Sequence, residues 1–142
     1  MTGIDTNIII DLIVDSSPHH QLSVEGISKL EDEACTTPTN VGECLWLLTH
    51  SKVFLKPMVL GQAVVILEQL FDYYKFRILD EPTDWWKELV HIEKEIPGIR
   101  GNEIFDARIA LCLKAHSVKR IYTRGADFRK YSFLKIFELA GV

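Results

Sequence analysis

Apolar residues in the first third of the chain alternate between short blocks that are typical of buried strands and longer runs with the spacing of amphipathic helices. A predicted strand over residues 2–5 is followed by a helix through residues 8–14, which ends at the Ser16-Ser17-Pro18 break, and by a second helix over residues 20–33. The stretch "ACTT" predicts another strand, and Pro38 stands where a helix commonly starts. The helix that begins there has one apolar face, formed by Val41, Cys44, Leu45 and Leu48.

The rest of the chain repeats this arrangement. A long predicted helix over residues 57–74 leads to the predicted strand "KFRIL" and then to an amphipathic helix over residues 83–98. "DARIALCLKAHS" is apolar around most of its circumference, which indicates a buried helix, and "RIYT" and "KIFEL" are the last predicted strands. Strands that alternate with helices in this way predict an α/β fold. We expect a single domain over residues 1–142, with a central, mainly parallel, twisted sheet between two helical layers.

Composition limits the class of protein. With 142 residues, of which 47% are hydrophobic and 25% are charged, the chain has the size and balance of one globular domain. No apolar run approaches the roughly 18 to 20 residues that cross a bilayer, so we expect a cytoplasmic protein without membrane association. Cys35, Cys44 and Cys112 lack CxxC spacing and have apolar neighbours, which favours reduced core thiols over a disulfide or a zinc site. The net charge of −4 argues against broad affinity for polyanions but allows a local basic groove.

Four acidic side chains share one kind of position. Each stands at the carboxyl end of a predicted strand or in the first turns of the following helix, among apolar residues: Asp5, Glu43, Asp106 and Asp127. Because ligands bind outside the carboxyl ends of parallel strands, we expect these acids to meet at one edge of the sheet. We expect Asp11, nearly two turns into its helix, to face solvent, and Asp80-Glu81 to cap or precede the next helix.

Four carboxylates at one edge repel one another and would retain protons unless cations neutralise them. Mg²⁺ or Mn²⁺ meets this need, because hard divalent ions take oxygen ligands and keep several waters, which leaves positions for a phosphodiester and its attacking water. Taken singly, each acid is better explained by stabilisation of a helix N-terminus or by a salt bridge. Their shared placement favours a metal site.

The segments that carry these acids also resemble a known family. "DTNIIIDLI" at the start and "FDARIALCLKAHSVKRIYTRGADF" near the end, with the looser "NVGECLWLL" between them, are similar to the PIN domain nucleases, in particular the VapC-type toxins of toxin–antitoxin pairs. The resemblance implies that the matching acids hold one or two Mg²⁺ or Mn²⁺ ions for RNA cleavage: Asp5, Glu43, Asp106 and Asp127. It also implies that Asn7 and Thr123 support the site.

The resemblance extends to partners and shows one departure. It implies a homodimer and a cognate antitoxin, of which one segment lies along apolar surface near the first helices. The candidates for exposed apolar positions there are Ile9, Ile13, Leu48 and Phe54, and the alternative is that most of them are core residues. The last motif of the family usually has the form Thr-x-Asp/Asn-x-Asp-Phe, whereas this chain has Gly125 at the middle position. We therefore expect the second metal position to be weak.

Basic and aromatic side chains near the acids have more than one interpretation. Arg108 and Arg124 are candidates for contacts with substrate phosphates. They belong to a larger cluster of cations around the last two acids: Arg100, Arg108, Arg124, Arg129 and Lys130. The alternative is that at least half of this cluster is solvated surface charge. Trp85 and Trp86 could stack on bases, but we favour one core residue and one partly exposed residue.

Two alternative interpretations of the function predict different features of the sequence. A non-catalytic PIN-like module for RNA binding or scaffolding is supported only by Gly125, and metal-dependent loss of intact RNA would separate it from a nuclease. A phospho-acceptor receiver domain is also doubly wound with clustered Asp residues, but it requires an acidic pair after the first strand and a Lys after the last one. Here the first predicted strand ends Asp5-Thr6-Asn7 with one acid, and no Lys lies at the other place, so we discount this fold.

Overall fold

One parallel sheet of five strands organises residues 1–139, the part of the chain that the computed structural model describes. Its strands are β1 (Thr2–Ile4), β2 (Ala34–Thr36), β3 (Arg77–Ile78), β4 (Arg120–Tyr122) and β5 (Lys135–Ile136). Their order is β3-β2-β1-β4-β5, and every neighbouring pair is parallel. The central strand is therefore β1, and the segment that follows it is flanked by those that follow β2 and β4.

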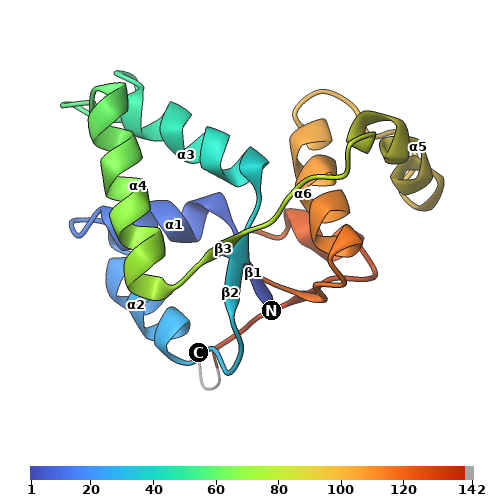
Figure 1. Ribbon diagram of the computed structural model, residues 1–142, viewed down its shortest axis with the longest axis horizontal. Coiled ribbons are helices and arrows are strands. Elements are labelled where there is room, and N and C mark those ends of the chain that lie inside the picture. Colours follow the sequence, from blue (N-terminus) through green and yellow to red (C-terminus); the bar gives the residue numbers. More distant parts are fainter. Residues whose placement is uncertain (140–142) are drawn as a thin grey trace.

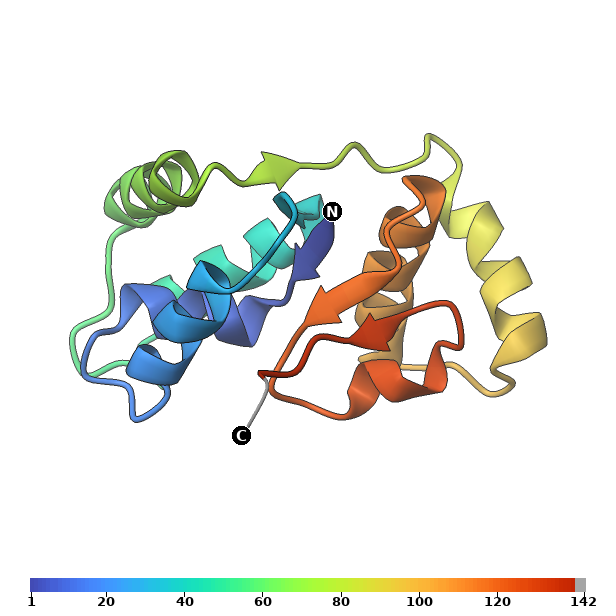
Figure 2. The same cartoon turned by 90° about the horizontal axis from the view of Figure 1, so that it is seen from below.

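Helices cover both faces of the sheet (Figures 1 and 2). One layer contains α1 (Thr6–Ile13), α2 (His20–Ser28), α3 (Pro38–Thr49) and α4 (Leu60–Tyr74), and the other contains α5 (Trp85–Glu95), α6 (Glu103–Ala115) and the 3-10 helix η1 (Asp127–Lys130). The predicted order of elements and the three-layer α/β/α architecture are confirmed. Within residues 1–139, no helix is both long and apolar enough to span a membrane.

Each helical layer buries its own apolar core against the sheet. On one face, Ile8 and Ile9 of α1 have no exposed surface and belong to a cluster with Cys44 of α3. On the other face, α6 is buried from Ala107 to Leu113 except at Arg108, as its apolar circumference predicts. All three cysteines are buried free thiols, and burial raises the pKa of Cys112 to about 11. The prediction of reduced core thiols is confirmed.

The exposed apolar surface is not where the sequence placed it. Ile9 and Leu48, two of the four candidate positions, are core residues, because α3 packs against α1 and covers this side of the helix. Ile13 and Phe54 are half-buried and line a pocket of about 230 Å³. The connection from α3 to α4 and the start of α4 carry the more exposed apolar side chains: Val53, Leu55, Val59 and Leu60.

Several helix boundaries differ from the predicted ones by a few residues, and two of these differences involve acidic residues. α2 ends at Ser28 instead of extending to residue 33, because the acidic run Glu31-Asp32-Glu33 would oppose the negative end of the helix dipole. α6 begins at Glu103, so Asp106 lies in its first turn rather than opening it. The carboxylate of Asp106 nevertheless stays at the amino end of this helix, where the sequence placed it.

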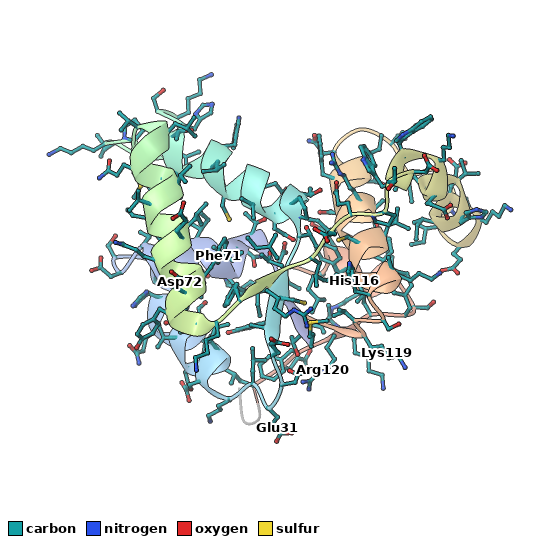
Figure 3. All side chains as sticks on the ribbon, in the orientation of Figure 1. Glu31, Phe71, Asp72, His116, Lys119 and Arg120 are labelled. Carbon is teal, nitrogen blue, oxygen red and sulfur yellow. The ribbon has the colours of Figure 1, made fainter. Side chains whose placement is uncertain are left out.

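Some of the charges at the amino ends of the strands form ion pairs. Figure 3 places Glu31, Lys119 and Arg120 on this side of the sheet. Arg120 forms an ion pair with Asp32 at 3.0 Å, and the N-terminal ammonium group of Met1 lies 3.2 Å from the same carboxylate. The acids that form the candidate site follow the opposite, carboxyl ends of the strands.

Candidate functional site

Asp5 is the centre of the candidate site and the N-cap of α1. It directly follows β1, and its Oδ1 accepts a hydrogen bond from the backbone N–H of Thr6 at 2.8 Å. Its Oδ2 accepts from the hydroxyl of Thr123 at 2.7 Å, and Asn40 Nδ2 donates to Oδ1 at 3.3 Å. Burial nevertheless raises the pKa of Asp5, because these hydrogen bonds only partly replace water. The charge of Asp5 is therefore compensated either by a proton or by a bound cation.

Glu43 is joined to Asp5 through two polar side chains. Thr6 donates its hydroxyl to Glu43 Oε1 at 2.8 Å, and Asn40 Nδ2 donates to Thr6 Oγ1 at 3.0 Å. Asn40 is 1% exposed, and its Oδ1 accepts from the hydroxyl of Thr37 at 2.7 Å. This network fixes α3, which carries Glu43, against the loop that carries Asp5.

Sequence reasoning missed the role of Asn40. Thr37, Pro38 and Asn40 are residue types that favour a helix start, and Thr37 does cap α3 by accepting from the backbone N–H of Asn40 at 3.2 Å. That local explanation accounts for the backbone but not for the inward side chain of Asn40. The sequence offers only the spacing of three residues, which puts Asn40 on the same face of α3 as Glu43 but does not reveal its contacts with Asp5 and Thr6.

The pKa of Asp106 is affected by the charges of the other three acids. Burial, followed by the negative charges of Asp5, Asp127 and Glu43, raises its pKa to about 6, and Lys130 opposes this effect. In the described part of the chain, no hydrogen bond or ion pair engages the carboxylates of Asp106 and Asp127. The structure therefore brings the four predicted acids into one electrostatic neighbourhood, with two of them free to bind a cation.

The donors in this neighbourhood fit a hard divalent ion. They are all oxygens, and the pKa values of Asp5, Glu43 and Asp106 are raised by burial and by the charge of at least one other acid of the four. Among residues 1–139, no three Asp, Glu, His or Cys side chains lie close enough to ligate one ion directly. Mg²⁺ usually keeps several waters and binds through one or two carboxylates. An open set of acids is thus compatible with an ion held partly through water.

Asn7 and Thr123, the two predicted supporting residues, lie beside Asp5. Thr123 is buried and donates its hydroxyl to Asp5 while accepting from Asn7 Nδ2 at 3.3 Å and from the backbone N–H of Gly125 at 3.2 Å. Asn7 Oδ1 accepts in turn from the backbone N–H of Arg124 at 3.4 Å. These contacts hold the turn after β4 against the start of α1, so that one oxygen of Asp5 keeps a fixed direction.

Asp11 does not face solvent, contrary to the prediction. It is 3% exposed and accepts from Arg124 Nε at 2.6 Å and Nη2 at 3.2 Å, and from the hydroxyls of Ser17 and Ser23. The prediction was wrong because α2 packs beside α1 and covers this position. Arg124 is thus bound to a buried carboxylate, and its contact with a substrate phosphate stays a prediction.

Arg108 is also paired with an acidic side chain. Its guanidinium binds both oxygens of Glu81, at 2.6 and 2.7 Å, and lies 3.8 Å from the ring centroid of Trp85. Glu81 therefore pairs with α6 in addition to preceding α5. Trp85 is partly buried against the core and Trp86 is 59% exposed, so the predicted asymmetry of the pair holds but neither ring is a core residue.

Gly125 has space for a larger side chain. It is exposed, its φ is outside the left-handed region, and an added Cβ would meet only Thr123 Oγ1, at 3.9 Å. A side chain here would therefore project close to the hydroxyl that orients Asp5. The glycine is not required by the backbone.

Solved structures share this fold. The chain is similar to Mycobacterium tuberculosis VapC20, described as a Sarcin-Ricin loop cleaving toxin, with a TM-score of 0.71 and 14% identity over 94% of this chain and 97% of that chain. It is also similar to VapBC-1 from nontypeable Haemophilus influenzae and to VapBC2 from Rickettsia felis bound to a promoter DNA fragment, each with a TM-score of 0.64 and 18% identity over 96% of both chains.

The family is shown by the sequence. No curated protein gives a significant match, but the PIN domain family matches residues 4–134, a span that contains all four carboxylates and both supporting residues. The match runs from the last residue of β1 through η1 and includes every residue of the candidate site. With its parallel sheet and its acids at the carboxyl edge, the chain belongs to the PIN domain family.

Proposed function

We propose that this chain is a metal-dependent endoribonuclease that hydrolyses RNA phosphodiesters and serves as the toxin of a toxin–antitoxin pair. The observation that carries the proposal is the meeting of four acids from four separate segments around Asp5, whose two oxygens are oriented by Thr123, Thr6 and Asn40. The similarity to VapC20, described as a Sarcin-Ricin loop cleaving toxin, supports the choice of substrate. A cytoplasmic site of action follows from such a substrate.

In the proposed mechanism, each acid has a stated role. Asp5, Glu43 and Asp106 would hold a first Mg²⁺ or Mn²⁺, directly or through water, and Asp127 would hold a second ion or position the attacking water. When bound, the ion lowers the pKa of its water and offsets charge on the phosphodiester. Thr123, Asn40 and Thr6 keep the carboxylates in fixed orientations. No side chain forms a covalent intermediate.

The proposal includes two protein partners. The VapBC structures from Haemophilus influenzae and Rickettsia felis, together with a toxin–antitoxin complex from Klebsiella pneumoniae, support a cognate antitoxin. The half-buried pocket at Ile13 and Phe54, and the exposed Leu55 and Val59 nearby in sequence, offer apolar surface for such a segment or for a second copy of the chain. A monodisperse monomer in light scattering at micromolar concentration would contradict the homodimer.

Without metal, Asp106→Asn is expected to be more stable than the parent at neutral pH. The pKa of Asp106 is about 6 in the folded chain, against the ordinary value of 3.8. Between these values the folded state binds more protons than the unfolded state, so the parent loses stability as the pH rises through this window. Because Asp106 is partly exposed, solvent screens part of this effect, and we expect Asn to gain about 1 kcal/mol of stability at neutral pH. Urea unfolding in EDTA should show the gap opening between about pH 4 and pH 6; a gap independent of pH would contradict the electrostatic coupling.

Gly125→Asp is expected to move the metal dependence of RNA cleavage to lower Mg²⁺ or Mn²⁺ concentration, because it returns an oxygen donor beside Thr123. Backbone strain should not obscure this effect, since φ at Gly125 lies outside the left-handed region. Gly125→Ala, which adds only the Cβ, is the control. The cleavage pattern should be unchanged. If Gly125→Asp is as stable as the parent and its metal titration does not move, Gly125 is not at a ligand position.

A further inference from the structure

A groove of about 730 Å³ opens beside the carboxylates, between α3 and the start of α6. Thr6 and Glu43 line one part of it, so it is continuous with the candidate metal site. Its walls are one face of each helix: Thr39, Gly42 and Trp46 recur at helical spacing on α3, and Phe105 lies in the first turn of α6. Its volume lies within the range of about 300–1,000 Å³ that is usual for small-molecule pockets.

Two aromatic rings in this groove are unusually exposed. Trp46 is 58% and Phe105 is 48% exposed, although large aromatic side chains normally bury most of their surface. Trp46 is also held in place, because the ring of His50 lies against it with centroids 4.5 Å apart, and His50 Nδ1 accepts from the backbone N–H of Lys52 at 3.0 Å. A ring that is exposed but positioned is suited to stacking on a flat ligand.

The charges of the groove favour a nucleobase over a phosphate. Among the described residues that line it, the one cation is Arg108, whose guanidinium already binds both oxygens of Glu81. Glu43 adds negative charge at the end nearest the metal site. Phosphate recognition needs free cations or backbone amides, whereas stacking on Trp46 and Phe105 needs neither.

We infer that this groove is a base-binding subsite, in which Trp46 and Phe105 stack on unpaired bases of single-stranded RNA next to the phosphodiester that is cleaved. The inference rests on the proposed ribonuclease function, and it specifies that the RNA bound at the site is single-stranded. Bases in a duplex are stacked and paired, so they could not enter the groove without being unpaired. The alternative occupant, a segment of a protein partner, is an outcome of the experiment below.

The first test measures RNA binding without turnover. Asp106→Asn, expected to be inactive, serves as the background, and the probe is a fluorescently labelled, mixed-sequence single-stranded oligoribonucleotide in Mg²⁺, followed by anisotropy. Adding Trp46→Ala should weaken binding by about tenfold, since one lost base–aromatic stack has an effect of this order. Adding Trp46→Phe, which keeps an aromatic face, should recover most of the affinity. Unlabelled duplex RNA of the same sequence should compete poorly.

A second test obstructs the groove without altering the rings or the acids, and it compares one variant inside the groove with one outside it. Gly42 lies on the groove face of α3, and an added Cβ would meet no atom within 4 Å, so Gly42→Phe should fold and obstruct the groove. Gly61 of α4 has equally open surroundings outside the groove lining, which makes Gly61→Phe the matched control. In the active protein, Gly42→Phe should raise KM for the oligoribonucleotide severalfold more than it lowers kcat. Gly61→Phe should change neither.

The two proposals fail in different ways. If the unmodified protein cleaves RNA but both Trp46→Ala and Gly42→Phe bind and cleave it as before, the base-binding subsite is overturned and the groove belongs to a protein partner. If the unmodified protein cleaves no RNA with Mg²⁺ or Mn²⁺, the ribonuclease proposal fails. In that case, RNA affinity that still depends on Trp46 would support the groove as an RNA-binding site by itself.

Discussion

Asp5→Asn and Asp106→Asn are each expected to abolish RNA cleavage with Mg²⁺ or Mn²⁺ while the fold stays intact. Asn keeps the shape of the side chain but removes the charge that holds the ion. Even residues that only orient metal ligands typically contribute 10–100-fold to affinity or activity, so loss of a ligand should cost more than about a hundredfold. Asn at position 5 can still accept from the backbone N–H of Thr6, which preserves the cap of α1.

The measurement is cleavage of a labelled single-stranded RNA over a titration of each ion, with a thermal unfolding curve of the same preparation. Asp72→Asn is the matched control, because Asp72 is an exposed acid on α4 and takes no part in the carboxylate site (Figure 3). Its activity should equal that of the parent. Full activity of Asp5→Asn or Asp106→Asn would sink the assignment of the site.

Asp11→Ala should cause the largest loss of stability among the acidic residues. The carboxylate is buried and satisfies two nitrogens of Arg124 and the hydroxyl of the buried Ser23, all of which lose their acceptor in the variant. Breaking a buried ion pair typically costs about 3–5 kcal/mol, and because the side chain of Arg124 is 37% exposed, we expect the lower end, about 3 kcal/mol.

Urea unfolding in EDTA measures this loss, and a double-mutant cycle isolates the pair. Arg124→Ala should cost less than Asp11→Ala, because Ser17 and Ser23 still donate to the carboxylate. The double variant should be more stable than the sum of the single losses predicts. Asp11→Ala within 1 kcal/mol of the parent would show that the contact with Arg124 contributes little.

Local sequence patterns were sufficient to predict the fold and the shared edge at which part of the candidate site lies. The apolar circumference of α6 and the short blocks around β1 and β4 reflect burial on a covered parallel sheet, which the sequence records residue by residue. Because parallel strands end at one edge, the placement of Asp5 and Asp127 next to one another followed from the order of elements.

Long-range partners were not predictable in the same way. Asp11 appeared to face solvent because helical spacing describes one helix, whereas its burial depends on α2 and on Arg124, 113 positions further along the chain. Asn40 was explained by a helix start, yet its side chain reaches Asp5 and Thr6 across the layer. In both cases the deciding contact joins segments that are separate in sequence, and no local pattern encodes it.

The most direct test of the metal-dependent ribonuclease is the fate of single-stranded RNA incubated with the purified protein in Mn²⁺, then in excess EDTA, then after Mn²⁺ is restored. The proposal predicts that full-length RNA is lost in Mn²⁺, that loss stops in EDTA and that it resumes with the ion. Because water is the nucleophile, the products should carry no 2′,3′-cyclic phosphate. RNA that stays intact with both Mn²⁺ and Mg²⁺, or cleavage that continues in EDTA, would contradict the proposal.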